Sequence, residues 1–190
     1  MIGVVCTSYP RSADDPAGSF VRTRVRALVQ AGHDIEVVAA GEPGDTVEGG
    51  VRVSRLAGSG SARLFYQGGA PEALTSSSGR AAAWLEALGF SARLVAHVAR
   101  RSTAWDAVES HWLVPSAVAV CAAAPRLRHR AHAHGGDIFL LERLPLGSCL
   151  ARFICRSGLD LVFVSRELHR RFSALCGAAP ETWGARTTIE

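Results

Sequence analysis

Three histidines and an aspartate surround a glycine pair at residues 129–137, which read His-Arg-Ala-His-Ala-His-Gly-Gly-Asp. The alternation of small and polar residues stops at Gly135-Gly136 and predicts a strand that ends in a tight turn. His132 and His134 then point to the same side of that strand. Ligands of open α/β sheets bind beyond the carboxyl ends of the strands, so this turn is the first candidate site. The competing interpretation is structural, with His132 packed in the core and the glycines forming only a turn.

Two further polar turns are expected at the same edge of the sheet. Residues 16–19, Pro-Ala-Gly-Ser, begin a helix whose free N–H groups and dipole suit an anion, and Gly18 permits close approach. A plain turn capped by Ser19 explains these residues equally well. His111-Trp112 follow another short strand and place an imidazole and an indole at its end. Core packing is the more common fate of such a tryptophan.

A metal centre is an alternative for the His-rich turn. His132-x-His134 followed by Asp137 resembles part of a metal-hydrolase ligand set. The amidohydrolase version adds a bridging Lys and later histidines, whereas this chain has no Lys and its later histidine, His169, falls on a predicted helix. The metallo-β-lactamase version places a third His directly after the Asp, where this chain has Ile138. We therefore expect no metal and no other cofactor, and metal-dependent hydrolysis stays a minor alternative.

Strands and helices alternate along the chain, which predicts an α/β fold with a doubly wound, mainly parallel sheet and helices on both faces. Apolar runs predict strands at 2–7 and 34–40, and further short strands are expected at 51–56, 106–110 and 159–164, beside the His-rich strand. Helical periodicity predicts helices at 19–32, 80–101, 115–124 and 142–156, and another that Ser165 caps.

Two segments carry no such periodicity. Residues 57–78 are rich in Gly and Ser and read as a surface loop. The Gly-Ser-Gly at 58–60 is not a P-loop, because the full spacing and the lysine are both missing. No pattern is assignable from 178 to 190. We expect one domain over residues 1–177, followed by a tail over 178–190.

Composition limits the partners. The 21 basic residues are all Arg, and the net charge of +4 permits an anionic partner without requiring one. The aromatics are not interleaved with the arginines, which argues against nucleic acid. The five cysteines form no C-x-x-C pair, as is usual in a reducing cytosol. The predicted location is cytoplasmic. Peripheral contact with the inner membrane face, through helix arginines 22, 24 and 26, stays open.

The polar turns belong to an ordered set of short motifs. The set resembles the N-terminal domain of GT-B-fold retaining glycosyltransferases of family 4, over about residues 1–177. Such a domain is Rossmann-like and forms half of the GT-B fold. The matching stretches, in order, are Tyr9-Pro10-Arg11, Ala17-Gly18-Ser19-Phe20-Val21-Arg22, Ala27-Leu28, Ala31-Gly32-His33-Asp34-Ile35-Glu36-Val37-Val38, Asp106-Ala107-Val108-Glu109-Ser110-His111-Trp112-Leu113-Val114-Pro115, His134-Gly135-Gly136-Asp137 and Val162-Phe163-Val164-Ser165-Arg166-Glu167-Leu168.

The resemblance implies transfer of a sugar from a nucleotide-sugar donor to a glycan or lipid-linked acceptor, with retained configuration and no obligatory metal. It implies that Gly18 and Ser19 approach the donor diphosphate and that His134 is the catalytic residue lining the reaction centre. It also implies that His111, Trp112 and Asp137 belong to the acceptor side, with Asp137 helping to shape the turn.

The resemblance also implies a second Rossmann-like domain that carries most donor contacts, whereas this sequence stops at Glu190. We therefore expect a truncated end and an incomplete enzyme that binds donor weakly alone, with a separate C-terminal half or a second copy of the chain as partner. Whether the chain is an enzyme stays open. The alternative is a non-catalytic module that binds a glycan, a lipid or a protein.

Overall fold

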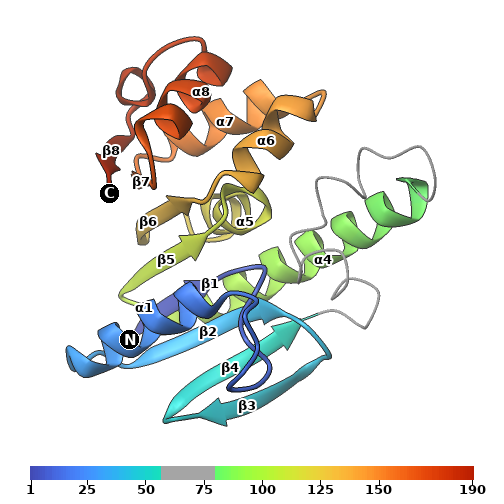
Figure 1. The fold of residues 1–190 in the computed structure, drawn as a ribbon, viewed down its shortest axis with the longest axis vertical. Coiled ribbons are helices and arrows are strands. Elements are labelled where there is room, and N and C mark those ends of the chain that lie inside the picture. The colour runs from blue at the N-terminus through green and yellow to red at the C-terminus, as the bar shows by residue number, and fades with distance from the viewer. Residues whose placement is uncertain (57–79) are drawn as a thin grey trace.

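A single eight-stranded sheet runs through the computed structural model, which describes residues 1–56 and 80–190 (Figure 1). The strand order is β3-β4-β2-β1-β5-β6-β7-β8, and every neighbouring pair is parallel except β3 and β4. This confirms the predicted α/β, mainly parallel, Rossmann-like architecture. The strands are β1 (Ile2–Val5), β2 (Ile35–Ala40), β3 (Gly44–Glu48), β4 (Val51–Leu56), β5 (Ala107–His111), β6 (Arg128–Ala133), β7 (Asp160–Phe163) and β8 (Arg186–Ile189).

Helices cover both faces of the sheet, but unequally. Along β1, Val4 packs in the core cluster of α1, whereas Val5 packs in the cluster of α4 and α5. Along β6, Ala131 and Ala133 pack toward α7 and α8, so His132 points to the face that carries α1. The helices are α1 (Ser19–Gln30), α4 (Arg80–Arg101), α5 (Val118–Ala123), α6 (Gly136–Arg143), α7 (Gly147–Arg156) and α8 (Arg166–Cys176).

Both strands that the sequence pattern missed lie at edges of the sheet. β3 is mostly exposed and pairs antiparallel with β4 across Gly49-Gly50, which have φ of 58° and 83°. A two-residue turn of this kind needs positive φ at both positions. β8 lies within the predicted tail over 178–190 and pairs with β7. The side chains of both strands are largely exposed, so neither strand needs an apolar run.

Helix boundaries bring two corrections. The single helix predicted over 142–156 is two helices, because Leu144 is extended (ψ 135°) before Pro145. A residue before proline avoids the helical region. Ser19 does not cap α1: the N-cap is Gly18, in the left-handed region, and no side chain caps that end. The prediction for Ser165 is confirmed, since its side chain accepts a hydrogen bond from the Leu168 N–H at 3.2 Å.

The expected surface loop at 57–78 lies outside the described residues. Among residues 1–56 and 80–190, no helix combines the length and apolar character needed to cross a membrane.

Candidate functional site

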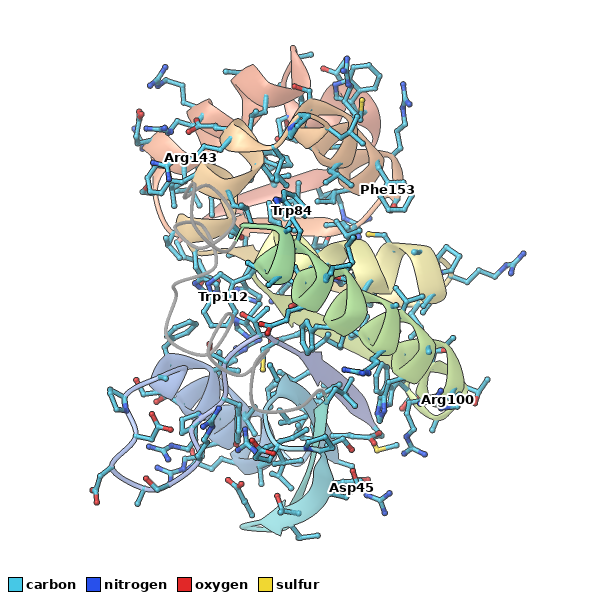
Figure 2. All side chains as sticks on the ribbon, turned by 90° about the vertical axis from the view of Figure 1, so that its right-hand side faces the viewer. Asp45, Trp84, Arg100, Trp112, Arg143 and Phe153 are labelled. Carbon is cyan, nitrogen blue, oxygen red and sulfur yellow. The ribbon has the colours of Figure 1, made fainter. Side chains whose placement is uncertain are left out.

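Three polar turns meet at the carboxyl ends of β1, β5 and β6. The ring centroid of Phe20, in the first turn of α1, lies 4.6 Å from that of His134 and 5.4 Å from that of Trp112. The Trp112 and His134 centroids are 5.2 Å apart. Figure 2 shows Trp112 near the middle of the molecule, far from Asp45 at the β3–β4 end and Phe153 at the α7 end. The three turns singled out in the sequence therefore form one surface.

Asp137 holds two of these turns together. Its buried carboxylate accepts hydrogen bonds from the backbone N–H groups of Leu113 (2.7 Å), His134 (3.2 Å) and Ile138 (3.0 Å). Burial raises the pKa of the Asp137 carboxyl, and the three backbone donors oppose that rise. Leu113 begins the turn after β5 and His134 begins the turn after β6, so this carboxylate fixes their relative position.

His111 and His134 are hydrogen-bonded to each other. His111 Nδ1 and His134 Nε2 are 3.0 Å apart, so one of the two nitrogens carries the shared proton. His111 is only 2% exposed and lies beneath His134, which is half-buried. Burial, reinforced by the neighbouring His132, lowers the pKa of His134 to about 4. Burial also lowers the pKa of His111 well below its ordinary value. Both rings are neutral at pH 7.

The Gly18-Ser19 turn begins α1 beside these rings. Gly18 has φ 72°, and a Cβ there would lie 2.3 Å from the backbone oxygen of Ser8. Glycine is therefore required for the loop to pack on the end of β1, whatever ligand binds nearby. The N–H of Ser19 donates to the Pro16 oxygen at 3.2 Å, and the Ser19 residue is exposed.

Trp112 occupies an uncommon backbone conformation. Its φ of 67° is positive, and among the non-glycine residues that the structure describes it stands alone in this respect. Such a conformation costs about 1–3 kcal/mol and persists where surrounding contacts impose it. Here the Trp112 N–H donates to the His132 oxygen at 3.0 Å. The strained turn directs the half-buried indole toward Phe20 and His134.

A charged layer that the sequence analysis did not single out lies below the aromatic surface. Glu109, two residues before His111 on the same face of β5, accepts two hydrogen bonds from Arg24 of α1, at 2.9 and 2.6 Å. Its carboxylate also lies 3.7 Å from His132 Nε2. Burial opposes ionisation, but contacts with His132 and Arg24 outweigh it and hold the pKa of Glu109 well below its usual range. Because alternate residues of a strand point to the same face, the position of Glu109 two residues before His111 was the feature of the sequence that could have identified it.

The helix arginines considered for membrane contact are partly engaged within the fold. Arg24 pairs with Glu109, and the guanidinium of Arg22 donates to the backbone oxygens of Ser12 and Ala13 at 2.7 and 2.8 Å. Because Arg22 and Arg24 are engaged within the fold, the prediction that these arginines contact an anionic membrane surface is weakened.

The cavities described in the structure lie away from the turn surface. A cavity of about 620 Å³ lies between α1, the 9–13 loop and the β3–β4 hairpin, with Arg22 and Arg26 in its wall. Another cavity, of about 230 Å³, is lined mostly by apolar residues of α4, α5 and α6. Neither is lined by His134, Trp112 or Gly18.

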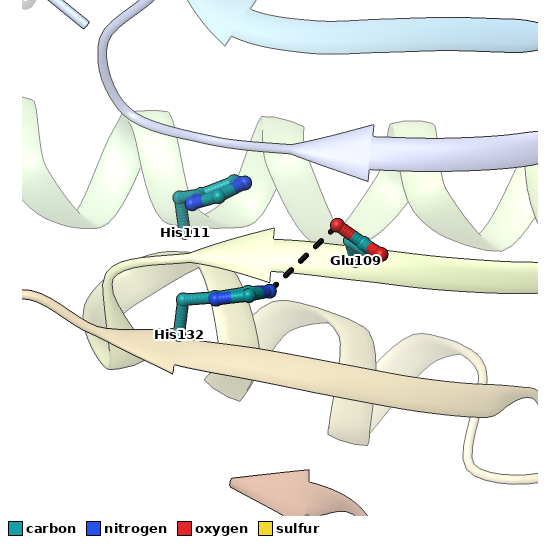
Figure 3. A group of neighbouring side chains, drawn as sticks. All are labelled: Glu109, His111 and His132. Carbon is teal, nitrogen blue, oxygen red and sulfur yellow. Dashed lines mark ion pairs between the residues drawn. The ribbon is translucent and has the colours of Figure 1, made fainter. Parts of the chain in front are cut away.

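The metal ligand set weighed from the sequence does not assemble. Asp137 uses both carboxylate oxygens on backbone N–H groups of the turns. A different group, Glu109, His111 and His132, brings its potential ligand atoms within 4.8 Å of one another (Figure 3).

No protein-family model matches the chain, and a search of curated proteins gives no match. Solved structures do match. An α,α-trehalose-phosphate synthase (UDP-forming) from Burkholderia vietnamiensis has a TM-score of 0.62 at 18% identity, over 99% of this chain and 48% of that one. An α,α-trehalose 6-phosphate synthase from Burkholderia multivorans has a TM-score of 0.60 at 17% identity, over 90% of this chain and 41% of that one.

The N-terminal domain of trehalose-6-phosphate phosphatase from Candida albicans is also similar, with a TM-score of 0.58 at 12% identity, over 93% of this chain and 42% of that one. The chain thus spans less than half the length of each of these structures. At such low identities the likeness concerns the fold. The chain has a Rossmann-like α/β fold, which it shares with these structures.

Proposed function

We propose that this chain is the N-terminal, acceptor-side domain of a glycosyltransferase that moves a sugar from a nucleotide-sugar donor to a glycan or lipid-linked acceptor with retained configuration. The observation that carries the proposal is the meeting of Phe20, Trp112 and His134 at the carboxyl edge of the sheet. Ligands of open α/β sheets bind at this edge. The fold-level likeness to two trehalose-phosphate synthases supports the same assignment.

The chemistry of the turn surface suits a sugar. Phe20 and Trp112 offer apolar ring faces, and His134 offers a neutral imidazole beside them. When His111 Nδ1–H donates to His134 Nε2, the proton of His134 lies on Nδ1, which is then a hydrogen-bond donor for a hydroxyl. We assign the reaction-centre role to His134, and to the buried His111 the role of fixing its tautomer.

The donor diphosphate is assigned to the start of α1, at Gly18 and Ser19, as the motif resemblance implies. The N-terminus of a helix favours negative charge that develops on a leaving diphosphate. Because most donor contacts in such enzymes come from a second domain, we expect this chain to bind a nucleotide diphosphate with a Kd of about 1 mM, or about −4 kcal/mol.

Calorimetric titration with UDP, GDP and their common sugars tests this assignment. We expect weak binding of one nucleotide, at least tenfold weaker in His134→Ala and unchanged in the control His33→Ala, whose side chain is exposed. Binding that is equally strong in His134→Ala contradicts the role of His134. Binding of free glycans without any nucleotide favours the non-catalytic binding module instead.

A further inference from the structure

A compact group of three metal-ligating side chains lies beneath the turn surface. Glu109 and His111 belong to β5 and His132 to β6, and their potential ligand atoms all lie within 4.8 Å of one another. Figure 3 shows the three side chains on the same side of the two strands, with the 3.7 Å contact between His132 Nε2 and the Glu109 carboxylate. The β5–β6 register places His111 beside His132, so the group follows from strand pairing.

Neither histidine of this group makes a hydrogen bond through Nε2 to another described residue, although His132 Nε2 lies 3.7 Å from the Glu109 carboxylate, within ion-pair distance. His111 and His132 are 2% and 7% exposed. A buried polar atom without a partner costs about 1–3 kcal/mol. His111 Nε2 is such an atom, and a metal ion that accepts its lone pair would remove this cost.

The hydrogen bond between His111 and His134 prepares one of these nitrogens. When His111 Nδ1 donates its proton to His134 Nε2, at 3.0 Å, His111 Nε2 carries a lone pair and no hydrogen. Metal-binding histidines usually donate their other ring N–H to an acceptor, most often a carboxylate, a backbone carbonyl or water. His134 supplies that acceptor here.

The donor set is two imidazole nitrogens and one carboxylate oxygen. This combination suits Zn²⁺ and related divalent transition metals, and leaves a fourth position open. Ligand atoms around a tetrahedral zinc ion lie ~3.4 Å apart, given metal–ligand distances of about 2.0–2.1 Å. The 3.7 Å between His132 Nε2 and Glu109 Oε2 is close to that spacing.

Arg24 is a cation that already occupies the Glu109 carboxylate and so disfavours the binding of a metal ion there. Its guanidinium donates two hydrogen bonds to Glu109, at 2.9 and 2.6 Å, and neutralises the carboxylate. The Arg24 side chain is 36% exposed, whereas that of Glu109 is 10% exposed. Arg24 can therefore turn out to solvent while Glu109 stays. A metal ion and Arg24 compete for the same carboxylate.

We propose that Glu109, His111 and His132 form a site for one divalent transition-metal ion, with Arg24 as the internal cation that the metal displaces. The bound ion ties the carboxyl ends of β5 and β6 together and fixes His134 through His111. The inference goes beyond the proposed function and does not depend on it, because metal binding is measured without any sugar or nucleotide.

The test is calorimetric titration of the chelator-treated full chain with Zn²⁺, repeated with Co²⁺ and absorption spectroscopy. The background is Cys149→Ser, because Cys149 is the exposed thiol among the five cysteines. We expect one ion per chain and d–d absorption without a thiolate charge-transfer band. Binding falls at least 100-fold in His132→Ala and in Glu109→Ala, and is unchanged in His33→Ala.

Two variants give the sharpest readouts. Arg24→Met removes the competing cation, so we expect metal affinity to rise about tenfold. His134→Ala removes the partner of His111 and should weaken binding about 10–100-fold without abolishing it. Circular dichroism of each variant establishes that it is folded.

Three results overturn the site. They are no stoichiometric binding in either the parent or Arg24→Met, undiminished binding in folded His132→Ala, and equal or lower affinity after Arg24→Met.

Discussion

Asp137 is the side chain on which the geometry of the turn surface depends most directly. It lies on the first turn of α6, yet its carboxylate is bonded to the backbone of both the His111-Trp112 turn and the His134 turn. In our proposal His134 contacts the sugar, and Asp137, which does not contact the sugar, holds His134 in place.

Replacing Asp137 with Asn tests this dependence. Asparagine keeps one acceptor oxygen and turns the other position into an N–H₂ group facing a backbone N–H donor. We expect a loss of about 2–3 kcal/mol in the free energy of unfolding, because a buried N–H group is left unpaired. Urea denaturation measures it.

The exposed Asp14→Asn is the matched control and should change the free energy of unfolding by less than about 0.5 kcal/mol. An equally small change in Asp137→Asn would show that the carboxylate does not hold the turns.

At the scale of elements, the loop before α1 depends on a glycine that cannot be replaced. Gly18 and Gly32 flank the same helix, and both have positive φ, 72° and 86°. They differ in their surroundings: a Cβ at Gly18 would lie 2.3 Å from Ser8 O, whereas a Cβ at Gly32 meets nothing within 4 Å.

We expect Gly32→Ala to lower the free energy of unfolding by about 1–2 kcal/mol, the cost of the left-handed backbone alone. Gly18→Ala adds overlap with backbone atoms, and the total loss should exceed about 3 kcal/mol. Urea denaturation of the two variants checks the ranking. Equal losses would mean that the loop moves away from β1 at little cost.

At the scale of the whole molecule, buried neutral histidines link stability to pH. Burial lowers the pKa of His129 to about 3, from about 6.5 in an unfolded chain. Between these values the unfolded chain binds a proton that the folded chain does not, so stability falls as pH falls below 6.5. His111 and His134, whose pKa values are also lowered by burial, act in the same direction.

For His129 alone, the expected loss between pH 7.5 and pH 5 is about 2 kcal/mol. Urea denaturation at several pH values should show this slope reduced by that amount in His129→Gln, and unchanged in the exposed His33→Gln. A slope that His129→Gln leaves unaltered would contradict the assignment, whatever the overall stability of the variant.

Local patterns in the sequence determined the order of the central elements. Apolar runs identified β1 and β2, since buried parallel strands tend to be apolar on both sides, and the alternation of strand-like and helical segments placed β4, β5 and β7. The polar turns after three strands could be placed at one edge because the carboxyl ends of parallel strands coincide. That rule predicted that His134, Trp112 and the start of α1 lie close together.

Tertiary structure decided what no local pattern encodes. β3 and β8 are held by backbone pairing to β4 and β7, and because their side chains are largely exposed, no apolar pattern marks them in the sequence. Glu109 meets Arg24 across 85 positions of sequence, and His111 meets His132 only through the β5–β6 register. Distances between residues on different elements depend on how the elements pack, which is why the sequence located the turn surface but not the charged group beneath it.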